Sequence, residues 1–176
     1  MEIILVRHTS VAVPKGICYG QTDVDVADTF EQESCLTKAN LEPYGPFDAV
    51  YASPLQRARK LAAYCGYTSP VLDDRLMEMS MGDWEMKRFE DLTDEYARRW
   101  FDDYLNLPTP GGESFPMLMA RVADFLNELK TKDFQRVAIF AHGGVLVCAG
   151  IIGGLFSVKD AYSNQVGYGG IERINL

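Results

Sequence analysis

Apolar residues occur in short runs along the chain, and each run is bounded by glycine or polar residues. Runs of four to eight β-branched, aliphatic and aromatic residues with such ends are typical of buried strands. They predict strands at Glu2–Arg7, Asp48–Ala52, Arg136–Ala141 and Gly170–Asn175, and a weaker one at Val71–Leu72.

Between these runs, apolar residues recur at the three- and four-residue spacing of helices. The segment Pro54–Cys65 is predicted to be a helix with Ser53 as N-cap, proline at the first position and Gly66 just beyond its end. An aromatic stripe predicts a second helix over Phe89–Tyr104. Two further helices are expected, one leading from Glu113-Ser114 to about Leu129 and one after Gly143-Gly144.

Strands that alternate with helices predict an α/β fold of three layers, α/β/α, with a mostly parallel, doubly wound sheet. Residues 1–176 suit a single domain, since domains contain roughly 100–200 residues. Two segments, Thr9 to about Cys35 and Leu105–Pro116, are mixed in composition and rich in turn residues, so they are predicted to be loops. Long loops in a compact domain are often functional.

The chain has only two histidines, and each one closes a predicted strand. Open α/β sheets bind ligands at the carboxyl ends of their strands. Arg7 precedes His8, and Gly143-Gly144 follows His142, where backbone N–H groups and a helix N-terminus can approach an anion. We interpret the pair as an anion site rather than as two structural histidines. The two strands should then be neighbours, with the rings within roughly 10 Å of each other, to share one phosphate.

Composition restricts what this site can be. A hydrophobic content of 47% and a charged content of 24% are ordinary for a soluble globular chain. The net charge of −8 argues against a general surface for nucleic acid or anionic membrane. An anion would therefore have to be bound locally, by a few arginines and backbone N–H groups.

Cysteine usage and the chain start indicate a cytoplasmic protein. The four cysteines are scattered, which fits reduced thiols better than disulfides or a zinc site. The first strand begins at once, without the basic region of a signal peptide, and the longest apolar stretch is too short and glycine-rich to span a bilayer. We expect no metal, no other cofactor, and no nucleic-acid or membrane partner.

Five motifs follow one another along the chain, at Leu5–His8, Tyr51–Ala58, Arg75–Glu85, Pro110–Ser114 and Ala141–Val145. In this order they resemble the hallmarks of the histidine phosphatase superfamily, which has the phosphoglycerate mutase-like fold. An Arg-His pair alone is a weak signal, whereas five motifs in order are specific. The chain's shortness and its Gly16–Asp23 stretch are similar to the α-ribazole phosphatase branch of that family.

The resemblance implies that His8 is a nucleophile that forms a phosphohistidine, and that His142 donates to a phosphate oxygen. It makes Arg7 and Arg57 the clamp on the phosphate, because a guanidinium is always charged and binds phosphate oxygens in bidentate fashion. The same two charges should keep the His8 imidazole neutral near pH 7. Gly143 is a further candidate for contact with phosphate.

The chain departs from the family pattern beside the nucleophile. Thr9 stands where the family usually has glycine, and Pro14 stands near a position that is often asparagine. These changes leave open which loop groups touch phosphate. Thr9, Ser10 and Thr22 are candidates.

The motif around Glu78 implies that this residue is the general acid, and then the base for water. Glu113 is the alternative acid, or it caps the next helix. Glu85 is interpreted as structural or as a residue at the rim of the site. Tyr19 and Trp84 lie on loop-like segments off the aromatic stripe, so they are candidate substrate contacts, as are Thr22 and Glu113. The stripe itself is expected to be core.

The leading hypothesis is a metal-independent phosphomonoesterase acting on a small phosphorylated metabolite, with α-ribazole 5′-phosphate of cobalamin assembly favoured. Three alternatives stay open. Phosphoglycerate mutases are similar but longer, and a catalytically idle binding member has no need of the complete residue set. Phosphohistidine-protein phosphatases are also short, but they generally lack the glutamate acid represented here by Glu78.

Overall fold

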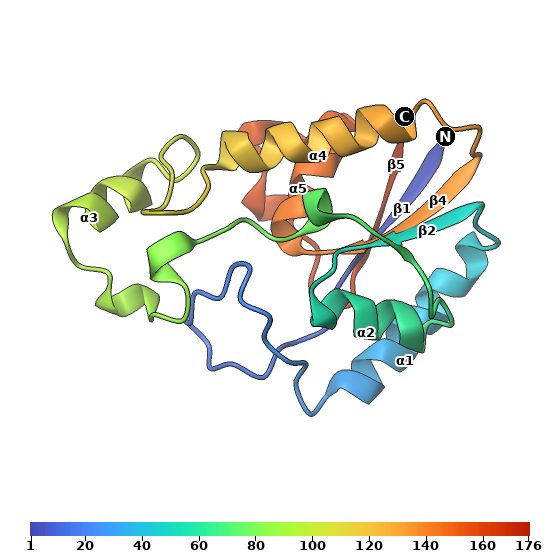
Figure 1. Ribbon diagram of the computed structural model, residues 1–176, viewed down its shortest axis with the longest axis horizontal. Helices are drawn as coiled ribbons and strands as arrows, with labels where there is room; N and C mark the ends of the chain where they lie inside the picture. Colours follow the sequence, from blue (N-terminus) through green and yellow to red (C-terminus); the bar gives the residue numbers. More distant parts are fainter.

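The computed structural model describes residues 1–176 and has a five-stranded sheet at its centre (Figure 1). The strands are β1 (Glu2–Arg7), β2 (Ala49–Ala52), β3 (Val71–Leu72), β4 (Arg136–Ala141) and β5 (Ile171–Asn175). They lie in the order β3-β2-β4-β1-β5, and only β5 is antiparallel to its neighbour. The predicted strands and the mostly parallel sheet are confirmed.

Helices cover both faces of the sheet, as Figure 1 shows. One face carries α1 (Phe30–Leu41) and α2 (Gln56–Tyr64), and the other carries α4 (Phe115–Leu129) and α5 (Gly143–Ile152). The helix α3 (Glu95–Asp102) lies away from the sheet at one end of the molecule. This arrangement confirms the three-layer prediction. Short 3-10 turns occupy Glu42–Tyr44, Asp74–Leu76, Gly82–Trp84, Phe89–Asp91, Val158–Asp160 and Tyr162–Asn164.

The alternation of side chains along the central strands explains the two layers. In β1, Ile3 and Leu5 join a core of 26 buried residues under α4 and α5, whereas Ile4 and Val6 join a core of 8 buried residues under α1 and α2. Successive strand residues point to opposite faces, so a strand covered on both sides is apolar at every position. This is why β1 reads as a continuous apolar run.

Helix α1 was not predicted, because Thr9 to about Cys35 was expected to be irregular. The helix begins at Phe30, inside that segment, and its buried positions are Ser34, Thr37 and Leu41. Two of the three are polar, so the helix has no apolar stripe to detect.

The starts of α2 and α3 also differ from prediction. Leu55, with an extended backbone, is the N-cap of α2, and Ser53 and Pro54 belong to the turn between β2 and the helix. The predicted helix over Phe89–Tyr104 is a 3-10 turn followed by α3, whose N-cap Asp94 accepts a hydrogen bond from the Ala97 N–H. The cap at Asp94 satisfies an N–H at the helix start and fixes where α3 begins.

None of the helices combines the length and the apolar character that a membrane crossing requires.

Candidate active site

The two histidines meet at the carboxyl edge of the sheet. β1 and β4 are parallel neighbours, and Arg7 is paired with Ala141, so His8 and His142 emerge side by side. Their ring centroids are 5.1 Å apart, well inside the separation at which two imidazoles can share one phosphate. Both rings are buried, with 1% exposure for His8 and 0% for His142.

The hydrogen bonding of His8 fixes its tautomer. Nδ1 lies 2.7 Å from the carbonyl oxygen of Thr9, and because a carbonyl can only accept, Nδ1 carries the proton and Nε2 keeps its lone pair. Burial lowers the pKa of His8 to about 3, the charge of Arg57 and then that of Arg7 adding to the effect, while the hydrogen bond to Thr9 opposes it. The lowered pKa keeps the imidazole neutral near pH 7, chiefly through burial, and the two arginines from which this was expected add to the effect.

We expect the protein to lose stability as pH falls from about 6.5 toward 3, the ordinary and the shifted pKa of His8. In this window the unfolded chain binds a proton that the folded chain does not, so the free energy of unfolding rises with pH. The pKa of His142 is also lowered, first by burial and then by His8 and Arg57, and acts in the same direction. Urea midpoints measured across this window should decline less in His8→Asn than in the wild type. Identical declines would contradict this account.

Arg7 and Arg57 are held by backbone carbonyls rather than by carboxylates. Arg57 is fully buried and donates to the carbonyls of Gly20 at 2.7 Å and Thr22 at 3.0 Å. Arg7 donates to the carbonyl of Val166 at 2.5 Å. Neither arginine takes part in any of the ion pairs of the protein, and both have a buried Nε without a partner. Two uncompensated cations thus lie beside the histidines.

A tyrosine ring lies against each of these arginines. The guanidinium of Arg57 is 5.2 Å from the ring centroid of Tyr19, and that of Arg7 is 4.4 Å from the ring centroid of Tyr168. The two hydroxyl oxygens are 3.1 Å apart. The aromatic faces attract the cations without neutralising them. Tyr168 was not among the predicted site residues, because it lies in a glycine-rich turn beyond the five motifs.

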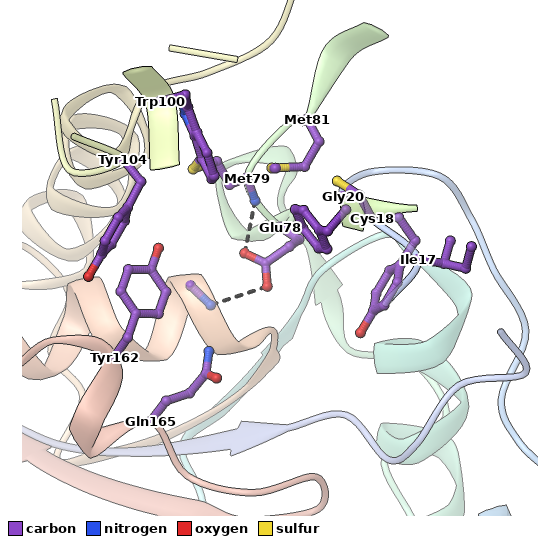
Figure 2. A pocket seen from close by; sticks show the side chains of 13 residues that line it. Ile17, Cys18, Gly20, Glu78, Met79, Met81, Trp100, Tyr104, Tyr162 and Gln165 are labelled. Carbon is purple, nitrogen blue, oxygen red and sulfur yellow. Dashed lines mark hydrogen bonds between the residues drawn. The ribbon is translucent and has the colours of Figure 1, made fainter. Parts of the chain in front are cut away.

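Glu78 is held at the same edge by two backbone N–H groups. Its carboxylate oxygens accept from Met79 at 2.9 Å and from Gly144 at 3.1 Å (Figure 2). A Cβ at position 144 would lie 2.4 Å from Oε1 of Glu78, so only glycine lets the carboxyl approach this closely. At position 143, a Cβ would lie 3.3 Å from Cζ of Arg7. The glycine pair therefore also makes room for side chains, beyond the predicted access for an anion.

Glu113 is placed as a structural residue, which does not support the alternative that it is the acid. Its oxygens accept from Nε and Nη2 of Arg121, at 2.8 and 2.9 Å, and from the Ser80 N–H at 2.7 Å. Burial alone would raise the pKa of Glu113, but these hydrogen bonds outweigh it and hold the pKa below its usual value. It does not cap α4 either, since Ser114 is the N-cap. Arg121 in turn donates to the carbonyl of Glu78 at 2.8 Å, so the pair supports the segment that carries Glu78.

The two threonines named as candidates occupy different positions. Thr9 is fully buried, and its hydroxyl has no hydrogen-bond partner, beside the carbonyl that orients His8. The Thr22 hydroxyl donates to Glu85, which also accepts from the Gln21 N–H at 2.9 Å. Glu85 therefore has the structural role expected for it, because it fastens the loop that supplies the carbonyls to Arg57.

The prediction that Trp84 contacts the substrate is corrected, because Trp84 lies in the core and not at the mouth of the site. The 3-10 turn at Gly82–Trp84 directs the indole inward, where it is 3% exposed and its ring centroid is 5.2 Å from that of Trp100. The aromatic stripe expected to be core is divided. Trp100 is buried, whereas Phe89 and Tyr104 are 36% and 39% exposed.

A cavity of about 340 Å³ opens beside Glu78 (Figure 2). Tyr104 and Tyr162 lie on one side of the carboxyl, and Ile17 and Cys18 lie on the other. Glu78 is the only charged residue of the lining. The apolar and aromatic lining residues are Ile17, Cys18, Tyr19, Met79, Met81, Phe89, Trp100, Tyr104 and Tyr162. Neither histidine and neither of the two arginines lines the cavity, but its lining residue Tyr19 packs on Arg57, and Gly144 follows His142 by two residues. The lining includes the predicted substrate contact Tyr19 but not Thr22, Trp84 or Glu113.

Nowhere in the protein do three or more His, Cys, Asp or Glu side chains gather in a group that could hold a metal ion. Besides burial, the charges of Arg57 and Arg7 act on both histidines and lower the pKa of each.

Comparison with known proteins agrees with this geometry. The model of the histidine phosphatase superfamily (branch 1) matches residues 3–158. A protein named as a phosphoserine phosphatase in Hydrogenobacter thermophilus is 34% identical over 82% of this chain and 74% of its own length. The adenosylcobalamin/alpha-ribazole phosphatase of Salmonella typhimurium is 33% identical over 83% of this chain and 76% of its own length.

A solved structure has the same fold. The alpha-ribazole phosphatase from Shigella flexneri superposes with a TM-score of 0.89 over 100% of this chain and 91% of its own, at 24% identity. That identity supports the shared fold alone, whereas the family match and the relatives above establish descent and activity class. The chain therefore belongs to branch 1 of the histidine phosphatase superfamily and is a phosphatase acting on small phosphorylated substrates.

Proposed function

We propose that the protein is a metal-independent phosphomonoesterase that forms a phosphohistidine on His8 and hydrolyses α-ribazole 5′-phosphate. The observation that carries the proposal is an apolar cavity with one charged lining residue, Glu78, and a wall, Tyr19, that packs on Arg57, one of two arginines without carboxylate partners. The arginines would attract the phosphate, and the cavity would take the uncharged remainder of the substrate.

In the first step, Nε2 of His8 would attack phosphorus while the bond from phosphorus to the substrate oxygen breaks. The lone pair on Nε2 and the neutral ring, both described above, suit this role. Arg7 and Arg57 would stabilise the equatorial oxygens of the transferring group. Glu78 would donate a proton to the departing oxygen, so that the product leaves as an alcohol.

In the second step, water would attack the phosphorus of the phosphohistidine. The Glu78 carboxylate, left without its proton by the first step, would accept one from the water as the bond between phosphorus and nitrogen breaks. Inorganic phosphate would then leave, and His8 and Glu78 would be restored. No metal is needed in this scheme, because the arginines supply the positive charge.

The cavity favours a substrate with a flat, uncharged body. Small-molecule sites have volumes of roughly 300–1,000 Å³ and mostly apolar walls, and the cavity of about 340 Å³ is at the lower end of this range. Tyr19, Tyr104 and Tyr162 offer ring faces and hydroxyl groups to a base and a ribose. The benzimidazole riboside of α-ribazole phosphate has this combination, and a relative 33% identical to the chain is named for the same compound.

Phosphoserine is the second candidate, because the chain is 34% identical to a protein named as a phosphoserine phosphatase. Phosphoserine and 3-phosphoglycerate each carry a carboxylate, which requires a cation or several hydrogen-bond donors when it is buried. The cavity contains no lysine, arginine or histidine, and its only acidic residue is Glu78. This is the physical reason for preferring α-ribazole phosphate to phosphoserine and to the mutase substrate.

We expect kcat/KM for α-ribazole 5′-phosphate to exceed the values for phosphoserine and 3-phosphoglycerate by at least about tenfold, or roughly 1.4 kcal/mol of discrimination. The measurement is phosphate release from each substrate, with a chelator present throughout. If phosphoserine is the better substrate, the α-ribazole assignment fails, and the phosphatase assignment remains.

Tyr104→Ala provides the matched variant for this comparison. Tyr104 lines the cavity and is 39% exposed, so the fold should tolerate its truncation. The variant should lower kcat/KM for α-ribazole phosphate and leave that for phosphoserine nearly unchanged. Equal losses on the two substrates would show that the cavity does not take the riboside.

A further inference from the structure

Ser53 is a buried serine that the phosphatase mechanism does not use. It follows β2 and lies next to the end of β4, where its N–H donates to the carbonyl of Phe140 at 2.9 Å. Its hydroxyl oxygen is 2.7 Å from Nε2 of His142, and both side chains have 0% exposure. The contact is thus a hydrogen bond, shielded from water, between the residue that follows β2 and the histidine that follows β4.

Counting donors and acceptors sets the direction of this hydrogen bond. The Ser53 hydroxyl has one proton and already accepts the N–H of Leu55 at 3.3 Å. If it donates its proton to Nε2, both the hydroxyl and Nε2 are satisfied, and the ring proton of neutral His142 is on Nδ1, which alone is left without a partner. If Nε2–H were the donor, the hydroxyl proton would need another acceptor, and the structure offers none.

We propose that Ser53 is a positioning residue, which holds His142 as the Nδ1–H tautomer and thereby makes it a hydrogen-bond donor to the phosphate. Nδ1 is buried and has no partner in the protein, beside the ring of His8 at 5.1 Å between centroids. In the other tautomer Nδ1 would present a lone pair, which repels a phosphate oxygen. The inference rests on the proposed function, since it takes the phosphate to be the group that Nδ1 meets.

The neutral state of His142 makes the tautomer decisive. An imidazolium donates from both nitrogens, so its partners would not matter. Burial, and then the neighbouring His8 and Arg57, hold the pKa of His142 well below its usual value. A neutral ring has a single N–H, and only a hydrogen bond to the other nitrogen decides where that proton is.

The tautomer is directly measurable, because the chain has only two histidines. Long-range ¹⁵N–¹H correlation spectra of the ligand-free protein distinguish a protonated from an unprotonated ring nitrogen. In the His8→Ala variant the only remaining imidazole signals are those of His142, which identifies them. We expect the proton on Nδ1. A proton on Nε2 in the wild-type protein would overturn the proposal, whatever the activity of the enzyme.

Three serine variants separate positioning from folding. Ser53→Ala should let the His142 proton populate Nε2, lower kcat by roughly 10–100-fold as loss of an outer-shell partner typically does, and weaken inhibition by inorganic phosphate. Ser53→Thr keeps the hydroxyl and should restore the Nδ1–H tautomer and most of the activity. Ser114→Ala removes the N-cap hydroxyl of α4, which accepts from Met117 at 3.4 Å and does not touch a histidine.

Ser114→Ala should lower the melting temperature, as Ser53→Ala does, without changing the tautomer or kcat. An unchanged His142 spectrum in Ser53→Ala would overturn the proposal, and so would a changed spectrum with unchanged kcat and phosphate inhibition. Because the spectra are recorded without substrate, a failure of the tautomer assignment is distinguishable from a failure of the proposed phosphatase chemistry.

Discussion

Replacing His8 with alanine is expected to abolish turnover, by a factor of about 10⁴ or more. The side chain would supply the attacking atom itself. His142 is engaged by Ser53, and Cys18 is the only one of the four cysteines that lines the cavity. Cys18 lines the cavity, but burial keeps its pKa raised to about 12, so it carries almost no thiolate.

Rapid quenching of the wild-type enzyme with labelled substrate should trap phosphate on the protein. The adduct should be labile in acid and stable in base, as expected for a phosphohistidine, and His8→Ala should give none. Turnover that persists in His8→Ala would refute the intermediate. A complete loss on chelation that a divalent ion restores would refute the metal-independent scheme.

Replacing Glu78 with glutamine should reduce kcat by roughly 10²–10⁴-fold while KM changes little. A proton donated to the leaving oxygen is an interaction of the transition state, so its loss affects turnover rather than binding. Glutamine keeps the size of the side chain and one carbonyl oxygen to accept from Met79 or Gly144. Since p-nitrophenolate leaves without needing a proton, the loss on p-nitrophenyl phosphate should be smaller.

Glu113→Gln is the matched control, because Glu113 lies in the neighbouring motif but is paired with Arg121. Breaking a half-buried pair should lower stability and loosen the support of Glu78, with a smaller effect on kcat than Glu78→Gln has. A larger kcat effect from Glu113→Gln would transfer the acid role to it. Equal losses on the natural and the activated substrate would remove that role from Glu78.

The sheet and the histidine pair were predictable from sequence for the same physical reason. A strand buried on both faces is apolar at every position, so β1 and β4 are visible as runs. The residue after such a run lies at the carboxyl edge, which locates His8 and His142. Helix α1 was not predictable, because its buried face includes Ser34 and Thr37 and it follows an irregular segment.

The cavity could not be predicted, because its walls come from segments far apart in the chain. Ile17 belongs to the first loop, Trp100 to α3 and Tyr162 to a turn after α5. Spacing predicts which face of a helix is apolar, but not whether that face meets the core or an open space. For this reason Trp84 was expected at the mouth and is buried, while Tyr104 was expected in the core and lines the cavity.

The bonding of Arg7 and Arg57 to carbonyls instead of carboxylates also affects the end of the catalytic cycle. Two cations without counter-ions, Arg57 buried and Arg7 half-buried, attract any dianion of the right shape, and inorganic phosphate should match them as well as the esterified phosphate does. If the two arginines hold the phosphate as proposed, product inhibition follows from their arrangement. Inorganic phosphate would then compete with the substrate, and the contacts of the organic part with the cavity would determine how well the substrate displaces it.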